Sequence, residues 1–159
     1  MSIRLSTAGV KVGYVVETTA GTRPTAGVIE IPEIKEIPEM NPEPSTLDTT
    51  TLKETEYKTS IPGLKDLGGA LGFLVNLTED FKTVWEEMVT AYETAKASGK
   101  NTWFVIQHPS LTEAVMFSGA PSALGLPGMS VDAVLEATVY VTPTNAPTWV
   151  EVPTWQEAQ

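Results

Sequence analysis

Cysteine is absent from the 159 residues of the chain, and histidine occurs once, at His108. Without cysteine the chain has no disulfide framework, no thiolate nucleophile and no cysteine-ligated zinc. A single histidine leaves too few nitrogen ligands for a transition-metal cluster. The sequence also has no apolar run of membrane-spanning length and no signal-peptide pattern at its start, so we expect no membrane segment.

Positive charge is scarce and unevenly placed. The chain has 20 acidic and 10 basic residues, a net charge of −10, and no lysine or arginine follows Lys100. A nucleic-acid-binding surface needs cations that neutralise phosphates, so this composition argues against specific binding of DNA or RNA. The acidic balance fits either simple solubility or a surface that repels phosphate for a functional reason.

Catalytic motifs are also missing. His108 lies in a predicted turn, and no Gly-x-Ser-x-Gly motif supports a catalytic triad that would include Ser110. The glycines of residues 68–72 are not followed by the lysine of a phosphate-binding loop. We therefore expect a protein that is not an enzyme and that has no catalytic, cofactor-binding or metal-binding residues.

One helix is predicted at about residues 79–98. Thr78 or Asp80 can cap its start, and Gly99 can end it in a left-handed conformation. Apolar residues recur at three- and four-residue spacing and form one stripe: Phe81, Val84, Trp85, Met88, Ala91, Tyr92 and Ala95. We expect this stripe, including both aromatic residues, to belong to the core.

The other predicted elements are strands. The clearest runs over residues 130–142, where every odd-numbered residue from 131 to 141 is apolar and is expected on a buried face. Residues 102–107 and 113–118 are predicted to pair through a turn at residues 108–110. Three more strands are expected, at residues 12–18, 28–31 and 70–77. The fold class is therefore mainly β with one flanking helix, a β-sandwich or barrel.

A long extended loop is predicted at about residues 38–67. Its prolines favour extended backbone, and six threonines between Ser45 and Thr59 favour β structure. Its sparse apolar residues, Leu47, Leu52 and Tyr57, are too few to form a core. We therefore predict a hairpin or strand extension that lies against another surface, which in a polymer would be a neighbouring chain.

The last segment, about residues 143–159, is predicted to be a C-terminal arm. It carries three prolines together with Trp149 and Trp155. Two tryptophans are costly to leave in water, so we expect both to dock. The sequence leaves open whether they dock on their own domain or on a neighbouring subunit.

Short segments along the chain, in order, resemble the major tail tube proteins of long-tailed, siphovirus-type bacteriophages. Among them are Leu-Ser-Thr-Ala-Gly-Val at residues 5–10, Glu-Thr-Thr-Ala-Gly-Thr-Arg-Pro at 17–24, Ile-Pro-Glu-Ile-Lys-Glu-Ile-Pro at 31–38 and Ser-Ala-Leu-Gly-Leu-Pro-Gly at 122–128. The other similar segments are residues 41–44, 54–58, 61–66, 68–71 and 76–78. The resemblance covers nearly the whole chain and fades after about Thr142.

The resemblance implies a single tail-tube domain over residues 1–159. Such proteins form rings, commonly hexameric, whose inner sheets join around a lumen. The rings stack into a tube around a tape-measure protein, and viral DNA later passes through the tube into the host. The implied partners are further copies of the chain, the tape-measure protein, and tail terminator and tail-tip proteins. The implied location is the virion tail, after assembly in the host cytoplasm.

Two sets of site residues follow from this resemblance and from the composition. An acidic lumen would let DNA pass without trapping it, and the candidate lumen-facing residues are Glu33, Glu36, Glu39, Asp132 and Glu136. The candidate self-assembly contacts are the apolar residues of the loop and the tryptophans of the arm: Leu47, Leu52, Tyr57, Trp149 and Trp155.

Three other functions compete with this interpretation. A carbohydrate-binding β-sandwich would use an exposed Trp103, Trp149 or Trp155 as a sugar platform and would bind glycans as a stable monomer. A small acidic hydrolase is disfavoured by the missing motifs. A head–tail connector or tail terminator would share similar strands but would stop at one ring.

Overall fold

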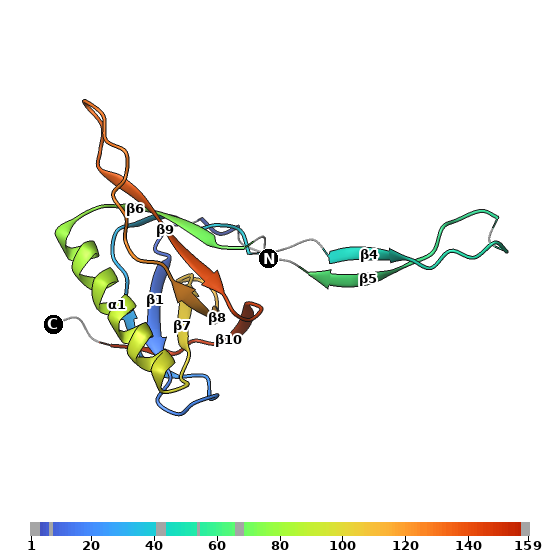
Figure 1. The fold of residues 1–159 in the computed structure, drawn as a ribbon, viewed down its shortest axis with the longest axis horizontal. Coiled ribbons are helices and arrows are strands. Elements are labelled where there is room, and N and C mark those ends of the chain that lie inside the picture. The colour runs from blue at the N-terminus through green and yellow to red at the C-terminus, as the bar shows by residue number, and fades with distance from the viewer. Residues whose placement is uncertain (1–3, 7, 41–43, 54, 66–68, 157–159) are drawn as a thin grey trace.

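The computed structural model of the chain describes residues 4–6, 8–40, 44–53, 55–65 and 69–156. Most of the strands form one strongly curled sheet, an incomplete barrel, and the helix lies across one of its faces (Figure 1). The expected fold class, mainly β with a flanking helix and a long extended loop, is confirmed. The structure differs from a sandwich in that the main sheet is continuous.

The strands are β1 (Lys11–Val16), β2 (Ala26–Glu30), β3 (Ile34–Glu36), β4 (Pro44–Asp48), β5 (Ser60–Lys65), β6 (Leu71–Asn76), β7 (Thr102–Gln107), β8 (Glu113–Pro121), β9 (Glu136–Pro143), β10 (Thr148–Glu151) and β11 (Thr154–Trp155). The main sheet has the order β11-β2-β1-β7-β8-β9-β6-β3, and β10 also pairs with β8. All of these pairs are antiparallel except β11 with β2, which is parallel. Strands β4 and β5 form a separate hairpin.

The helix α1 (Glu79–Ala97) has the predicted start and end. The Thr78 hydroxyl accepts a hydrogen bond from the Phe81 N–H at 3.2 Å and so caps the first turn. Gly99 follows the last turn with a φ of 74°, a left-handed conformation that glycine adopts without a steric cost. Local signals in the sequence were therefore sufficient to place this helix.

Two hydrophobic clusters lie on opposite faces of the sheet. The first lies between the sheet and α1, where Phe81, Trp85 and Met88 are buried. The second lies under the C-terminal arm. Successive side chains of a strand point to opposite faces of the sheet. In β7, Phe104 accordingly belongs to the first cluster and Val105 to the second. The helix and the arm therefore cover one face each.

The strand predicted for residues 130–142 begins later than expected. It starts at Glu136, and only its later odd-numbered residues, Ala137, Val139 and Val141, are buried. The expectation for Val131 was wrong, because its side chain is 90% exposed. Asp132 explains the difference: its φ of 59° is left-handed and forms a turn that aspartate tolerates better than most residues. The alternation of apolar residues in the sequence therefore continues through a turn and does not mark where the strand begins.

Glu17 is a buried carboxylate that directly follows β1 and is hydrogen-bonded to the start of β7. It is 2% exposed. One carboxylate oxygen accepts the N–H groups of Gly21 at 3.1 Å and Asn101 at 2.8 Å, and the other accepts the indole N–H of Trp103 at 3.1 Å. Burial raises the pKa of Glu17, but these hydrogen bonds lower it and prevail, so the pKa lies below its usual value.

A pH-dependent contribution to stability follows from Glu17. Because its folded pKa is depressed, its contribution is complete above the unfolded pKa of about 4.3 and is lost as the pH falls through the folded pKa. The variant Glu17→Gln should lose about 2 kcal/mol of unfolding free energy at pH 7, the scale of hydrogen bonds to a charged group. Urea midpoints of both proteins from pH 7 to pH 3 measure this. The gap should narrow below about pH 4; a constant gap would contradict the assignment.

Candidate assembly surfaces

The loop predicted at residues 38–67 contains the β4–β5 hairpin, which Figure 1 shows projecting far from the curled sheet. Residues 41–43, 54, 66 and 67 of that loop lie outside the described residues. Leu47 pairs with Ile61, and beyond the strands the Thr49 N–H donates to the Thr59 carbonyl at 2.9 Å. The predicted hairpin is confirmed, whereas its docking on a neighbouring chain stays a prediction.

The hairpin exposes four large apolar side chains. Their exposed fractions are 54% for Leu47, 105% for Leu52, 82% for Tyr57 and 50% for Ile61. A two-stranded hairpin without a covering layer is marginally stable in water, so these side chains favour burial against another surface. Three of the predicted self-assembly contacts lie here. Sequence reasoning missed Ile61, whose relation to Leu47 depends on the strand register.

A second projection is the β8–β9 loop, residues 122–135, which Figure 1 shows extending from a different side of the body than the hairpin. It exposes Leu126, Met129, Val131, Val134 and Leu135, the first four by 65% or more. Sequence reasoning missed this surface because half of the loop was assigned to a buried strand. The backbone turns at Asp132, where φ is left-handed, and the apolar alternation of the sequence hides this turn.

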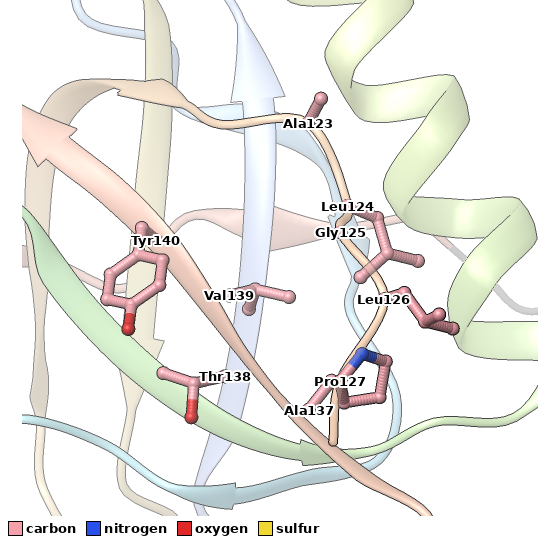
Figure 2. Close-up of a pocket in the computed structure, with 9 residues that line it drawn as sticks. All are labelled: Ala123, Leu124, Gly125, Leu126, Pro127, Ala137, Thr138, Val139 and Tyr140. Atoms are coloured by element: carbon pink, nitrogen blue, oxygen red, sulfur yellow. The ribbon is translucent and has the colours of Figure 1, made fainter. Parts of the chain in front are cut away.

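A pocket of about 280 Å³ opens at the base of the β8–β9 loop. Residues 123–127 run beside β9 there, and the Ser122 N–H donates to the Tyr140 carbonyl at 2.9 Å before the segments diverge. Figure 2 shows Leu124, Leu126 and Pro127 on one side and Val139 on the other. Ligand sites for drug-sized molecules cover about 300–1,000 Å³, so this pocket lies at the lower limit of that range. An apolar cavity of about 150 Å³ holds benzene, so this pocket suits one aromatic side chain.

Two of the predicted lumen-facing acids are near one another, and a third lies in the adjoining loop. Glu33 and Glu136 both lie at the same end of β6, because the Asn76 side chain donates to Glu33 at 3.3 Å while Asn76 is opposite Glu136 in the ladder. Glu136 also forms an ion pair with Lys35 at 2.9 Å. Asp132 lies in the adjoining β8–β9 loop.

Glu36 lies in the edge strand β3, and Glu39 lies in the segment after it. Glu36 ends β3, the last strand in the order of the main sheet, and Glu39 follows it. Both are exposed, as are Glu33 and Asp132. A lumen is a property of many copies, so the lumen-facing role of the five acids stays a prediction.

The two tryptophans of the arm are placed differently. Trp155 packs against the second hydrophobic cluster, its indole N–H donates to the Gln107 side chain, and the Lys11 ammonium lies 5.6 Å from its ring centroid. Gly13 permits this packing, since a Cβ there would lie 2.5 Å from the Trp155 ring. Trp149, on β10, is 61% exposed. Trp155 therefore docks on its own domain, and Trp149 offers its ring to solvent.

His108 and Trp103 both have structural contacts. The Ser110 N–H donates to Nδ1 of His108 at 3.1 Å, which leaves the proton on Nε2 for a hydrogen bond to the Ser6 carbonyl. Trp103, considered above for a sugar platform, is half-buried and bonded to Glu17. Across the described ranges, no three histidine, aspartate or glutamate residues are grouped as metal ligands. The described part of the chain also has no helix long and apolar enough to cross a membrane.

Comparisons with known proteins place the fold. No protein-family model and no curated protein matches the chain. A chain in the cryo-EM structure of the anti-feeding prophage baseplate, six-fold symmetrised, matches with a TM-score of 0.65 and 13% identity over 96% of this chain and 99% of that one. A chain of the anti-feeding prophage cap, the tube-terminating cap, matches with a TM-score of 0.58 and 9% identity over 96% and 95%. The chain therefore shares its fold with components of a prophage-derived particle.

Proposed function

We propose that the chain is a structural subunit of a phage tail and works by assembling with further copies of itself. The observation that carries this proposal is the projecting hairpin, whose apolar side chains have no covering layer in a single copy. The fold shared with a baseplate and a cap chain, over nearly the full length of each, supports it. The chain is then located in the tail of a virion.

Within the tail, the chain forms the tube. Hexameric rings stack around a tape-measure protein, and tail-tip and terminator proteins bound the stack. The six-fold symmetry applied to the baseplate structure supports six copies in a ring. The acids at the β3 edge and in the β8–β9 loop face the lumen, where they repel the phosphates of passing DNA. A tube structure with all five acids on the outer wall would contradict this placement.

The chain carries out no catalysis in this role. Both ring nitrogens of His108 are engaged in hydrogen bonds to the backbone, so the side chain is not poised as a general base.

A second candidate function is a terminator that caps the tube. The shared fold with the tube-terminating cap favours it. A terminator and a tube subunit differ in one physical property, because the tube subunit offers matching surfaces on both sides of its ring and the terminator on one side only.

Negative-stain electron microscopy of the purified protein over a range of concentrations tests the proposal. We expect stacked rings or hollow tubes of uniform bore, because a repeated head-to-tail contact continues until a cap stops it. Single rings that never stack would favour the terminator. A monomer that stays single at every concentration, with tape-measure and tail-tip proteins added, would contradict both.

A further inference from the structure

The hydrogen-bond ladder between β8 and β9 stops before β9 does. Among the described residues, β8 pairs with β9 as far as Pro121, and one further bond joins the Ser122 N–H to the Tyr140 carbonyl at 2.9 Å. A continued ladder would pair the next part of the chain with Thr138. In the described structure residues 123–127 instead run apart from β9 and make no such pair. The sheet therefore has a gap beside Thr138.

Two contacts hold this gap open. The Trp85 indole N–H donates to the Ser122 carbonyl at 2.9 Å, which directs that carbonyl toward α1. The Leu124 side chain packs against the first hydrophobic cluster, between the sheet and the helix. Figure 2 shows residues 123–127 running between β9 and α1. The gap is therefore built into the packing of the helix on the sheet.

The backbone of β9 presents polar groups to this gap. On the other side of β9, the Leu77 N–H donates to the Leu135 carbonyl at 3.0 Å. In an antiparallel ladder, alternate residues direct their backbone groups to the same neighbour, so the odd-numbered residues of β9 face β6 and the even-numbered ones face away from it. The bond from Ser122 to Tyr140 follows this alternation. Thr138 therefore directs its N–H and carbonyl into the gap, as an exposed strand edge does.

The pocket of about 280 Å³ lies at this gap and adds a place for a side chain. Leu124, Leu126 and Pro127 line one side of it and Val139 the other, so a single aromatic ring fits between apolar groups (Figure 2). All the lining residues belong to the part of the chain beyond Lys100, which has five acids and no base. A basic residue next to the ring is therefore favoured over an acidic one.

The exposed aromatic residues of the chain itself are poor occupants of this pocket. Tyr140 lines the pocket, and Trp149 lies on β10, whose backbone already pairs with β8. Tyr57 is close in sequence to Thr59, whose N–H and carbonyl are bonded across the hairpin to Thr50 and Thr49. The site instead suits a segment of a different protein whose extended backbone is free to pair.

We propose that the gap beside Thr138 is a peptide-binding site for an extended segment of a different protein. An aromatic side chain of that segment enters the pocket, the next residue pairs with the backbone of Thr138, and a basic residue follows. This inference goes beyond the proposed assembling function, because the partner is not a copy of the chain. Main-chain pairing supplies affinity, and the pocket supplies specificity for the ring.

Saturation-transfer NMR on a dilute sample of the full chain tests the site, with the capped tripeptide acetyl-Phe-Thr-Arg-amide as the probe. The phenylalanine ring protons should receive the strongest saturation. Replacing phenylalanine with alanine should weaken binding about tenfold, because the apolar contact is lost. Methylating the threonine nitrogen should weaken it about fivefold, because one backbone hydrogen bond is lost. Replacing arginine with glutamate should weaken it about twofold at low salt.

Two variants of the same loop localise the binding. Leu126 is 85% exposed and lines the pocket, so Leu126→Ser should weaken binding of the probe about fivefold. The matched control is Val131→Ser, at a residue that is 90% exposed and is not part of the pocket lining, and it should bind the probe as the wild type does.

Three outcomes would overturn this inference. The first is no saturation of the probe, or equal binding of the phenylalanine and alanine peptides. The second is an equal effect of Leu126→Ser and Val131→Ser. The third is tighter binding by a peptide of residues 55–59 of this chain than by the probe, which would assign the pocket to a second copy. Each of them leaves the proposed assembling function intact.

Discussion

Replacing Leu52 and Tyr57 together with serine should abolish assembly at concentrations where the wild-type chain forms rings or tubes. Both side chains are almost fully exposed in one copy, so their loss should leave the fold intact. A well-anchored interface residue costs about 2 kcal/mol or more on truncation. Two such losses correspond to roughly a thousandfold rise in the concentration required. Sedimentation velocity and electron microscopy over a concentration series measure this rise.

The control replaces two exposed leucines that lie elsewhere, on the body. Leu5 and Leu111 are exposed by 47% and 38% on the body, and the variant Leu5→Ser with Leu111→Ser should assemble as the wild type does. Far-UV circular dichroism of both variants shows that each copy remains folded. Assembly of the Leu52 and Tyr57 variant at the wild-type concentration would show that the hairpin makes no energetically important contact.

Trp85→Ala should cause a large loss in the free energy of unfolding. The Trp85 side chain is 1% exposed, its ring stacks on Phe81 at 5.6 Å, and its indole N–H donates to the Ser122 carbonyl at 2.9 Å. Removing a buried tryptophan costs about 3–5 kcal/mol. The lost hydrogen bond adds about 1 kcal/mol. Small domains have about 5–15 kcal/mol in total, so this loss is a large fraction of the free energy of unfolding.

Urea unfolding followed by circular dichroism measures that loss, with two comparisons. Trp85→Phe keeps most of the packing and loses the hydrogen bond to Ser122, so it should lose about 1–2 kcal/mol. Tyr92→Ala removes an aromatic ring from the same helix at a half-buried position and should cost less than Trp85→Ala. Equal losses for Trp85→Ala and Tyr92→Ala would show that burial against the sheet does not set the cost.

Elements that depend on neighbouring residues could be predicted from the sequence. The helix follows from its apolar period, the Thr78 cap and Gly99. Strand β7 has the predicted bounds, and its pairing with β8 follows from a short connection. Antiparallel neighbours joined by a turn need little chain closure, so local patterns indicate them well.

Elements that depend on distant residues could not be predicted in this way. Nothing near Trp155 indicates that it packs where Gly13 lacks a side chain, because the two residues lie at opposite ends of the chain. The residues of the candidate assembly surfaces differ in the same way in whether the sequence could predict them. Leu47, Leu52 and Tyr57 were chosen because a proline- and threonine-rich segment has no core of its own. The exposed residues of the β8–β9 loop were missed, because an apolar alternation that belongs to β9 begins before its first residue.

The parallel pairing of β11 with β2 sets a late step in biosynthesis. The ribosome makes Ala26 long before Thr154, although the two residues are partners in the same sheet. Until the arm emerges, the cluster that contains Val28, Val105 and Met116 lacks its cover on that face. Once β8 has been made, this apolar face therefore stays uncovered until the arm has also been made and has docked on it.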